Sequence, residues 1–405
     1  MIRPPTHQRR QVAWLSGAGF VSALAVVGML TGCDATTDVE VLRLEVEPAA
    51  GLVAGLGETT RFLVVARGVG GVEVSADGAE WSSDRPSVAV VDSRGVVTGI
   101  GEGEAELTVR LQGLEASASV EVYVPPTITE YRPGISYLGR RGYVEYVPGE
   151  LPVILSAPHG GDLAPDEMAD RTSGVAVTDT NTRELTWAVR DAFVDLTGKA
   201  PHVIVSHLDR GKLDPNREIV EAAQGDPFAE QAWEEYHDFI EEARNKVAIS
   251  GEGMYFDMHG HGHPVARLEL GYLLSADRLN GDDESLNGLA TVQLTSIREI
   301  GSDSSLPFSQ LLRGPTSLGG LLQDRGVPSV PSPDMPSPGS DPYFSGGYST
   351  ERHGSRADTE LVSGIQLEHH YPGIRDNDAN RRAYSVLLAE AVRDFMLEHI
   401  GRFED

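Results

Sequence analysis

Short runs that alternate apolar with polar residues dominate the chain between about residue 40 and residue 124. Examples are LRLEVEP (42–48), RFLVVAR (61–67), AELTVRL (105–111) and SASVEVYV (117–124), with Gly, Asp, Pro and Ser clusters between them. A period of two places every second side chain on one face of a strand, and the clusters between the runs are typical of turns. The pattern predicts an all-β sandwich over residues 40–124.

The pattern changes behind the stiff connector VPPT (124–127). Continuous apolar runs typical of buried strands follow: PVILSA (152–157), HVIVS (202–206), MYFDM (254–258), LELGYLL (268–274) and GIQLE (364–368). Three segments between and after them have apolar residues at helical spacing: 182–197, ended by Gly198; a helix opened by Asp226 and Pro227; and 387–396. This order predicts an α/β domain over residues 130–405, with a mainly parallel or mixed sheet flanked by helices, of a phosphorylase/hydrolase-like kind. Ligands of such sheets bind beyond the carboxyl ends of the strands.

The stretch VPSVPSPDMPSPGSDPYFSGG (327–347) is rich in Pro, Ser and Gly. It is too long for a simple connector inside a compact domain. We expect a surface loop or an active-site lid, and flexible filler is the alternative.

The first residues predict a leader rather than a folded element. Arg3, Arg9 and Arg10 precede a mostly apolar or small stretch (12–30), and LTGC follows at 30–33. This is the pattern of a secretion signal over residues 1–33. LTGC resembles a bacterial lipobox, which implies cleavage before Cys33, a lipid on its thiol, and a protein exported and anchored at the bacterial cell envelope. The alternative is an ordinary cleaved signal with a chance cysteine.

Charge and cysteine content narrow the chemistry. The formal net charge of −28 predicts repulsion of nucleic acid and of anionic lipid headgroups, so membrane contact is expected through the lipid on Cys33 only. Cys33 is also the only cysteine of the chain. A metal site would therefore use His, Asp and Glu side chains.

Histidines and acids follow the predicted strands. The segment SAPHGGD places His159 after the first strand, FDMHGH places His259 after the third, and QLEHH places Glu368 at the end of a later one. Because the carboxyl ends of parallel strands line one crevice, we expect these side chains to converge. Single histidines at such places are more often satisfied polar residues, and the convergence is what favours a site.

Two resemblances follow from longer motifs. Residues 81–109, WSSDRPSVAVVDSRGVVTGIGEGEAELTV, resemble the bacterial immunoglobulin-like group 2 domain. The motifs PHGG (158–161), DTNTREL (179–185), LDPNRE (213–218), DMHGH (257–261) and GIQLE (364–368) together resemble the N-formylglutamate amidohydrolase family and, more distantly, zinc carboxypeptidases and aspartoacylases. This second resemblance implies hydrolysis of an amide bond near a carboxylate, with one Zn²⁺ ion bound by two histidines and an acid.

Transferred to this sequence, the resemblance implies His159 and His259 as metal ligands. For the third ligand, Asp162 stands in an HxxD arrangement with His159, whereas Asp179 better matches an aspartate of the amidohydrolase pattern; Asp179 is favoured. Its alternative role is the N-cap of the following helix. His259 is favoured over His261 and His263, whose roles stay open.

The base and the substrate contacts are expected nearby. Glu368 ends a buried strand, where an ionised side chain needs a partner, and it suits the general base. Asn216 and Arg217 resemble the pair that holds a substrate carboxylate in aspartoacylases and carboxypeptidases, and a guanidinium gives two parallel hydrogen bonds to a carboxylate. Arg210 is close enough in sequence to assist them.

The expected function is therefore an exported zinc amidohydrolase. Its partner would be a small-molecule or peptide substrate with a carboxylate, such as an N-acyl amino acid or a glutamyl-type amide. The form DPNR departs from a DLNR-like pattern and puts formylglutamate itself in doubt. Alternatives are a metallopeptidase or polyglutamate hydrolase on the same site, and a surface adhesin without activity.

Overall fold

The structure is a computed structural model of the chain, and it describes residues 40–356 and 360–404. The predicted signal over residues 1–33, with Cys33, lies outside the described residues. None of the helices within these two ranges is long and apolar enough to span a membrane.

The described part of the N-terminal region is built of strands, apart from one short 3₁₀ helix, Val69–Gly71. Its strands are β1 (Arg43–Glu47), β2 (Ala50–Ala54), β3 (Thr59–Arg61), β4 (Leu63–Arg67), β5 (Glu73–Val74), β6 (Glu80–Ser83), β7 (Ala89–Val91), β8 (Val96–Gly99), β9 (Gly103–Leu111) and β10 (Leu114–Tyr123). They form three small sheets, β1-β4-β5, β2-β10-β9-β6 and β3-β8-β7. Alternate residues such as Leu107, Val109, Val120 and Val122 are buried in a shared core, as the period of two predicts. The predicted all-β class is confirmed.

The second region is an α/β domain around one mixed sheet. Its strands are β11 (Tyr137–Leu138), β12 (Val144–Val147), β13 (Val153–Ala157), β14 (His202–Ser206), β15 (Gly253–His261), β16 (Leu268–Gly271), β17 (Ser329–Val330) and β18 (Val362–His370). Their order across the sheet is β11-β12-β14-β13-β15-β18-β16-β17. The four central strands, β14, β13, β15 and β18, run parallel, and β12 and β16 are antiparallel to their neighbours β14 and β18. The predicted α/β class with a parallel or mixed sheet is confirmed.

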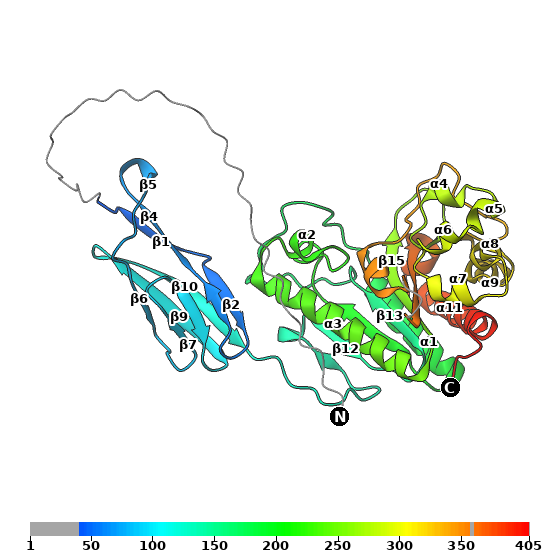
Figure 1. Ribbon diagram of the computed structural model, residues 1–405, viewed down its shortest axis with the longest axis horizontal. Coiled ribbons are helices and arrows are strands. Elements are labelled where there is room, and N and C mark those ends of the chain that lie inside the picture. The colour runs from blue at the N-terminus through cyan, green and yellow to red at the C-terminus, as the bar shows by residue number, and fades with distance from the viewer. Residues whose placement is uncertain (1–39, 357–359, 405) are drawn as a thin grey trace, which may run out of the picture. The chain divides into compact units, whose positions relative to one another are not determined.

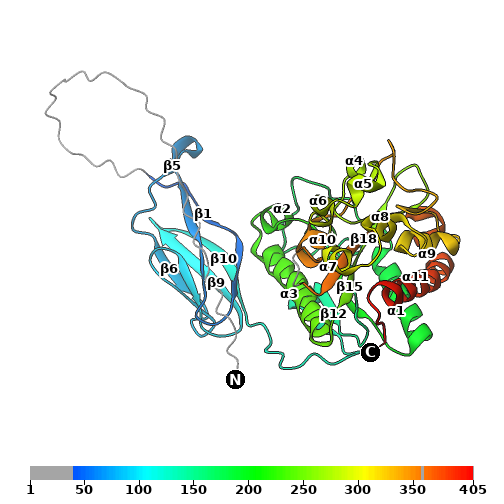
Figure 2. The same ribbon diagram turned by 45° about the vertical axis from the view of Figure 1, so that its right-hand side comes forward.

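Long helices cover both faces of this sheet. The helices are α1 (Thr182–Thr197), α2 (Ile219–Ala223), α3 (Pro227–Ser250), α4 (Ala276–Leu279), α5 (Asp283–Leu286), α6 (Leu289–Val292), α7 (Arg298–Asp303), α8 (Phe308–Arg313), α9 (Leu318–Asp324), α10 (Tyr348–His353) and α11 (Asp378–His399). The helix α3 lies over one face (Figure 1), and α10 lies beside β15 and β18 (Figure 2). α1, α9 and α11 share the apolar core of the other face.

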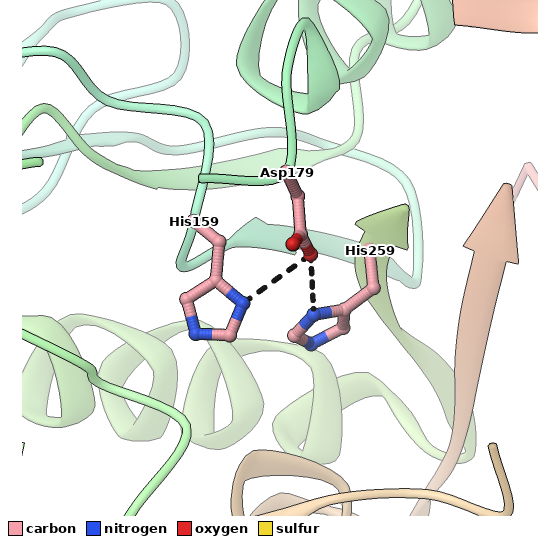
Figure 3. Close-up of side chains that lie close together, drawn as sticks. All are labelled: His159, Asp179 and His259. Atoms are coloured by element: carbon pink, nitrogen blue, oxygen red, sulfur yellow. Dashed lines mark hydrogen bonds and ion pairs between the residues drawn. The ribbon is translucent and has the colours of Figure 1, made fainter. Parts of the chain in front are cut away.

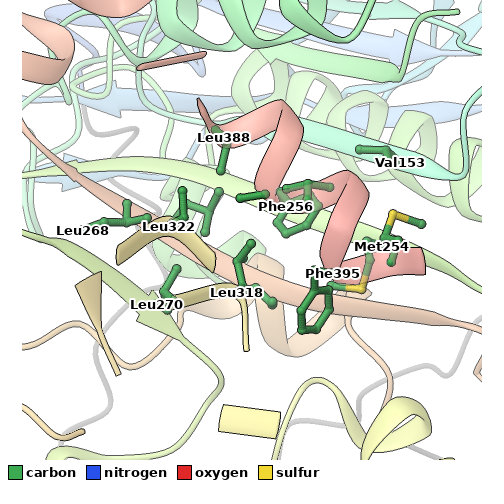
Figure 4. Packing of buried hydrophobic residues seen from close by; sticks show 14 of the residues in the cluster. Val153, Met254, Phe256, Leu268, Leu270, Leu318, Leu322, Leu388 and Phe395 are labelled. Carbon is green, nitrogen blue, oxygen red and sulfur yellow. The ribbon is translucent and has the colours of Figure 1, made fainter. Parts of the chain in front are cut away.

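Successive side chains of β15 point alternately to these two faces of the sheet. Met254, Phe256 and Met258 belong to the core shared with α1 and α11, and Figure 4 shows Phe256 near Phe395 of α11. Tyr255 belongs to the core shared with α3. Side chains alternate along a strand, so Asp257 and His259 point to the α3 side like Tyr255.

The ends of the helices agree with the expected signals. α3 begins after Asp226, whose carboxylate accepts from the backbone N–H groups of Phe228 and Ala229, with Pro227 in the first turn. α1 ends at Gly198 in the left-handed region. The alternative role of Asp179 as N-cap of α1 is not found, because Asn181 occupies that position.

Candidate metal centre

The strands extend further than their sequence pattern predicted. β15 continues past the predicted run, through His259 and Gly260, to His261. His259 therefore lies within the strand and not after it. β18 likewise continues past Glu368 to His370. In the register of the sheet, His259 lies opposite Glu368, and Glu368 lies opposite Glu269 of β16. The three form a row across neighbouring strands on the α3 side of the sheet.

His159, Asp179 and His259 meet at the carboxyl end of the central strands (Figure 3). Oδ2 of Asp179 lies 3.3 Å from Nδ1 of His159 and 3.2 Å from Nδ1 of His259. One donor atom of each residue lies within 4.8 Å of the others, and all three residues are buried. Asp179 is held there by its neighbours, because its backbone N–H donates to the carbonyl of His159 (3.0 Å) and its Oδ2 accepts from the N–H of Gly260 (3.1 Å).

Each imidazole has a second carboxylate on its other nitrogen. Nε2 of His159 donates to Oδ1 of Asp214 (2.6 Å), and Nε2 of His259 lies 3.0 Å from Oδ2 of Asp257. Asp214 and Asp257 are fully buried. A proton on Nε2 leaves a lone pair on Nδ1, and both Nδ1 lone pairs then face an anionic oxygen of Asp179. Such an arrangement is stable only with a positive charge between these atoms.

The donor set therefore fits a metal ion. Two imidazole nitrogens and one carboxylate oxygen are ligands that zinc accepts, and three protein ligands leave a coordination position open. Ligating histidines usually donate their other N–H to a carboxylate or carbonyl, as His159 and His259 do here.

The charges of the metal-free chain point the same way. Burial raises the pKa of Asp179, but the imidazoles of His159 and His259 outweigh it and hold this pKa well below its usual range. Burial lowers the pKa of His259, but Asp257 and Asp179 outweigh it, so the net pKa is raised well above its usual value. A proton on His259 thus balances carboxylates that a divalent cation would balance in its place.

Asp162, the alternative third ligand, lies elsewhere. Its side chain is 78% exposed and its Oδ1 pairs with Nη1 of Arg183 at 3.1 Å. Within the described residues, Asp179 is the carboxylate that faces both Nδ1 atoms.

Glu368 lies beside this group with one oxygen unused. Its Oε1 accepts from the side-chain amide of Gln366 (2.9 Å), and its buried Oε2 has no hydrogen-bond partner among the residues that the structure describes. Burial and the negative charges of Asp179, Glu269 and Asp257 raise the pKa of Glu368 to about 8, against the lowering effect of His259. A buried carboxyl with a raised pKa and a free oxygen is suited to proton transfer.

Comparisons with known proteins give structural similarity but no family. No family model matches the chain. N-formylglutamate amidohydrolase from Ralstonia eutropha JMP134 is similar over 63% of this chain and 98% of its own, with 13% identity and a TM-score of 0.36. The surface layer protein SbsC is similar over 27% of this chain and 18% of its own, with 17% identity and a TM-score of 0.21. The polysaccharide lyase 8 family protein HylA of Enterococcus faecalis is 38% identical over 61 residues, which are 15% of this chain and 4% of that protein.

The resemblances expected from the motifs are thus found again as structural similarity, to an N-formylglutamate amidohydrolase and to surface layer domains. The chain spans only small parts of SbsC and HylA.

The residues expected to hold a substrate carboxylate have partners within the chain. Arg210 is buried, and its guanidinium lies 3.0 Å from Oδ2 of Asp214 and 3.4 Å from Oδ1 of Asp179, so it braces the carboxylates around the histidines. Nε of Arg217 pairs with Glu221 of α2 at 3.1 Å. The substrate roles of these two arginines stay predictions.

Asn216 does reach the centre. Its Nδ2 lies 3.3 Å from Nε2 of His259, and its Oδ1 accepts from the backbone N–H of Ser349 at the start of α10 (2.8 Å).

Sequence reasoning missed a junction around Glu269. Its carboxylate lies 3.0 Å from Nδ1 of His263 and 3.6 Å from Nε of Arg267, and accepts from the backbone N–H of Phe344 (2.8 Å). The ring of Phe344 stacks on His263 with centroids 4.6 Å apart. This junction holds the Pro-rich stretch 327–347 against the strand next to Glu368. In the sequence, the closely spaced histidines are the one signal for this junction. Glu269 and Phe344 lie in different segments, so their contact cannot be read from the sequence.

One nitrogen or oxygen atom of each of His261, His263 and Glu269 also lies within 4.8 Å of the others. The ring of His261, however, is used by the backbone: Nε2 donates to the carbonyl of Arg267 (2.8 Å), and Nδ1 accepts from the N–H of His263 (3.1 Å). Arg267 supplies positive charge to Glu269. These contacts satisfy the group without a metal.

Proposed function

We propose that the chain is a zinc-dependent amidohydrolase that cleaves an amide bond of a carboxylate-bearing substrate, such as an N-acyl amino acid or a glutamyl-type amide. One observation carries the proposal: the Nδ1 atoms of His159 and His259 converge on one oxygen of Asp179 while both Nε2 atoms face buried carboxylates. One ion is expected, held by these three residues.

A divalent ion bound there supplies polarisation of the amide carbonyl and greater acidity of a nearby water molecule. Glu368 is the general base in this proposal. Its Oε2 accepts the proton of the attacking water and returns it to the leaving nitrogen, so the bond to nitrogen breaks as an amine departs. Positive charge at the centre favours the ionised form of Glu368, as His259 already does.

Other side chains would position the substrate. Asn216 is next to His259 and can hydrogen-bond the substrate through its amide. Arg210 pairs with the buried carboxylates of Asp214 and Asp179. Arg217 is proposed to turn from Glu221 to the substrate carboxylate when one is bound. We place the substrate entrance beside Phe344 and His263, because Phe344 is 44% exposed and stacks on the imidazole of His263 next to Glu269.

The test is an assay of the zinc-loaded protein against a panel of N-acyl amino acids, glutamyl amides and peptides. Turnover that a chelator abolishes and zinc restores is expected. Cleavage of internal peptide bonds or of polyglutamate chains instead of acyl amino acids would favour the metallopeptidase or polyglutamate hydrolase alternative. If the protein neither binds metal nor turns over any substrate, the result would favour the alternative of a surface adhesin without activity.

We also propose that the protein is exported and anchored by a lipid on Cys33. The basic and apolar leader followed by LTGC supports this. Labelling of cells with a fatty acid analogue should mark the wild type and leave the Cys33→Ser variant unmarked.

A further inference from the structure

Arg375 is a buried arginine that contacts three separate segments around the candidate metal centre. It lies in the turn Tyr371–Arg375 that follows β18, and it is 3% exposed. Its Nε donates to the carbonyl of His369 (3.0 Å), its Nη2 to that of His261 (3.3 Å) and its Nη1 to that of Thr180. These carbonyls belong to the end of β18, the end of β15 and the residue after Asp179.

The backbone of Arg375 is fixed to the same place. Its carbonyl accepts from the side-chain amide of Asn181 (2.8 Å) and from Nη1 of Arg381 at the start of α11 (3.0 Å). The segment carrying Asp179 is thus tied to Arg375 through Thr180 and Asn181. The flat guanidinium has several N–H donors in fixed directions and is therefore suited to donate to three carbonyls at once.

Gly260 leaves the space for this guanidinium. A Cβ added at residue 260 would lie 2.2 Å from Cζ of Arg375. The backbone at Gly260 does not have a positive φ, so the glycine is required by close approach and not by a turn. The N–H of Gly260 in turn donates to Oδ2 of Asp179 (3.1 Å). Arg375, Gly260 and Asp179 therefore form one connected unit, and Asp179 is the member that contacts both His159 and His259.

The positive charge of Arg375 lies near the carboxylates of the metal centre. All three acceptors are uncharged carbonyls, and an unbalanced buried cation is costly. Burial lowers the pKa of Arg375, while the nearby Asp179 and Glu368 raise it. The carboxylates of the centre are thus the charges that make the buried guanidinium tolerable.

We propose that Arg375 is a positioning residue of the metal centre, which holds Asp179 in register with His259 by joining the carbonyls of Thr180, His261 and His369. This inference rests on the proposed metal-dependent function. It assigns no contact with substrate to Arg375; the residue acts through Asp179 and through the ends of β15 and β18.

The experiment compares metal affinity and metal-free stability in matched variants. Arg375→Gln and Gly260→Ala should weaken zinc binding, measured by competition with a chromophoric chelator, by about 10–100-fold, as loss of outer support of ligands typically does. Arg375→Lys keeps the charge but not the planar fork, and its affinity should lie between. Gly262→Ala is the control for Gly260→Ala, because a Cβ at Gly262 meets nothing within 4 Å. It should bind zinc like the wild type.

A second readout separates positioning from general stability. Hydrogen exchange of the Gly260 amide in the metal-free protein should speed up in Arg375→Gln, because the acceptor Asp179 is no longer held. If the variants unfold at lower temperature but their folded fraction binds zinc like the wild type, the inference is overturned. If Gly262→Ala loses as much affinity as Gly260→Ala, it is overturned as well. A wild type that binds no zinc refutes the proposed function, whereas wild-type binding with unchanged variants refutes only the role of Arg375.

Discussion

Replacing Asp257 with Asn tests whether the outer carboxylates prepare the histidines for a metal. Asp257 is fully buried; its Oδ2 lies 3.0 Å from Nε2 of His259, and its Oδ1 accepts from the hydroxyl of Ser156 (3.0 Å). The variant keeps the shape and removes the negative charge. With the amide nitrogen toward His259, the proton of the imidazole moves to Nδ1 and blocks the metal-facing atom. With the amide oxygen there, a weaker neutral acceptor remains.

The expected loss is about 10–100-fold in zinc affinity, which corresponds to roughly 1.4–2.7 kcal/mol. A hydrogen bond to a charged group contributes about 1.5–3 kcal/mol, which agrees with this range. Because solvent does not screen a fully buried pair, we expect the upper half of it. The assay is chelator competition at fixed pH, combined with thermal unfolding of the metal-free form to show that the variant is folded.

Asp162→Asn is the matched control for this prediction. Asp162 is exposed and pairs with Arg183, so the zinc affinity of the Asp162→Asn variant should equal that of the wild type. An Asp257→Asn variant with affinity within twofold of the wild type would refute the reasoning. Equal losses in both variants would do the same.

Three further results are expected. Glu368→Gln should retain zinc and lose about 10²–10⁴-fold in kcat, since the proton acceptor is removed. Loss of zinc together with activity would instead indicate that Glu368 is a metal ligand. An unchanged kcat would exclude Glu368 as the base. Zinc affinity should rise with pH, because the pKa of His259 is raised in the metal-free chain and its proton must leave before Nδ1 can bind the metal. Calorimetry in buffers of different ionisation enthalpy should detect the released proton. A zinc affinity that does not change with pH would contradict this protonation of His259. Phe344→Ala should change KM and substrate preference without changing zinc affinity, because the contacts of Phe344 are with His263 and Glu269, which are not expected ligands. Identical preference across the substrate panel would show that Phe344 does not line the proposed entrance.

The sequence predicted the elements whose signals are local. The capping Asp226, the terminal Gly198 and the apolar runs marked α3, α1 and the central strands, because each depends on neighbours in the chain. The convergence of His159 with His259 was predictable too, since parallel strands end at one edge.

Features that depend on contacts between distant segments were not predictable. Gly260 lies inside β15 and makes room for Arg375, which is 115 residues further along the chain, so its neighbours in the sequence do not show this role. The length of β15 and β18 is set by their pairing with each other, and the apolar run alone ended earlier. Neither Glu269 nor Phe344 carries a motif that shows their contact.

The central claim is that one divalent ion is bound between Nδ1 of His159, Nδ1 of His259 and the carboxylate of Asp179. Anomalous X-ray diffraction at the zinc edge, from crystals of the zinc-loaded protein, tests it most directly. The account predicts one strong peak within bonding distance of all three atoms. A zinc-loaded crystal with no peak there, or with the ion bound by Asp162 in place of Asp179, would contradict it.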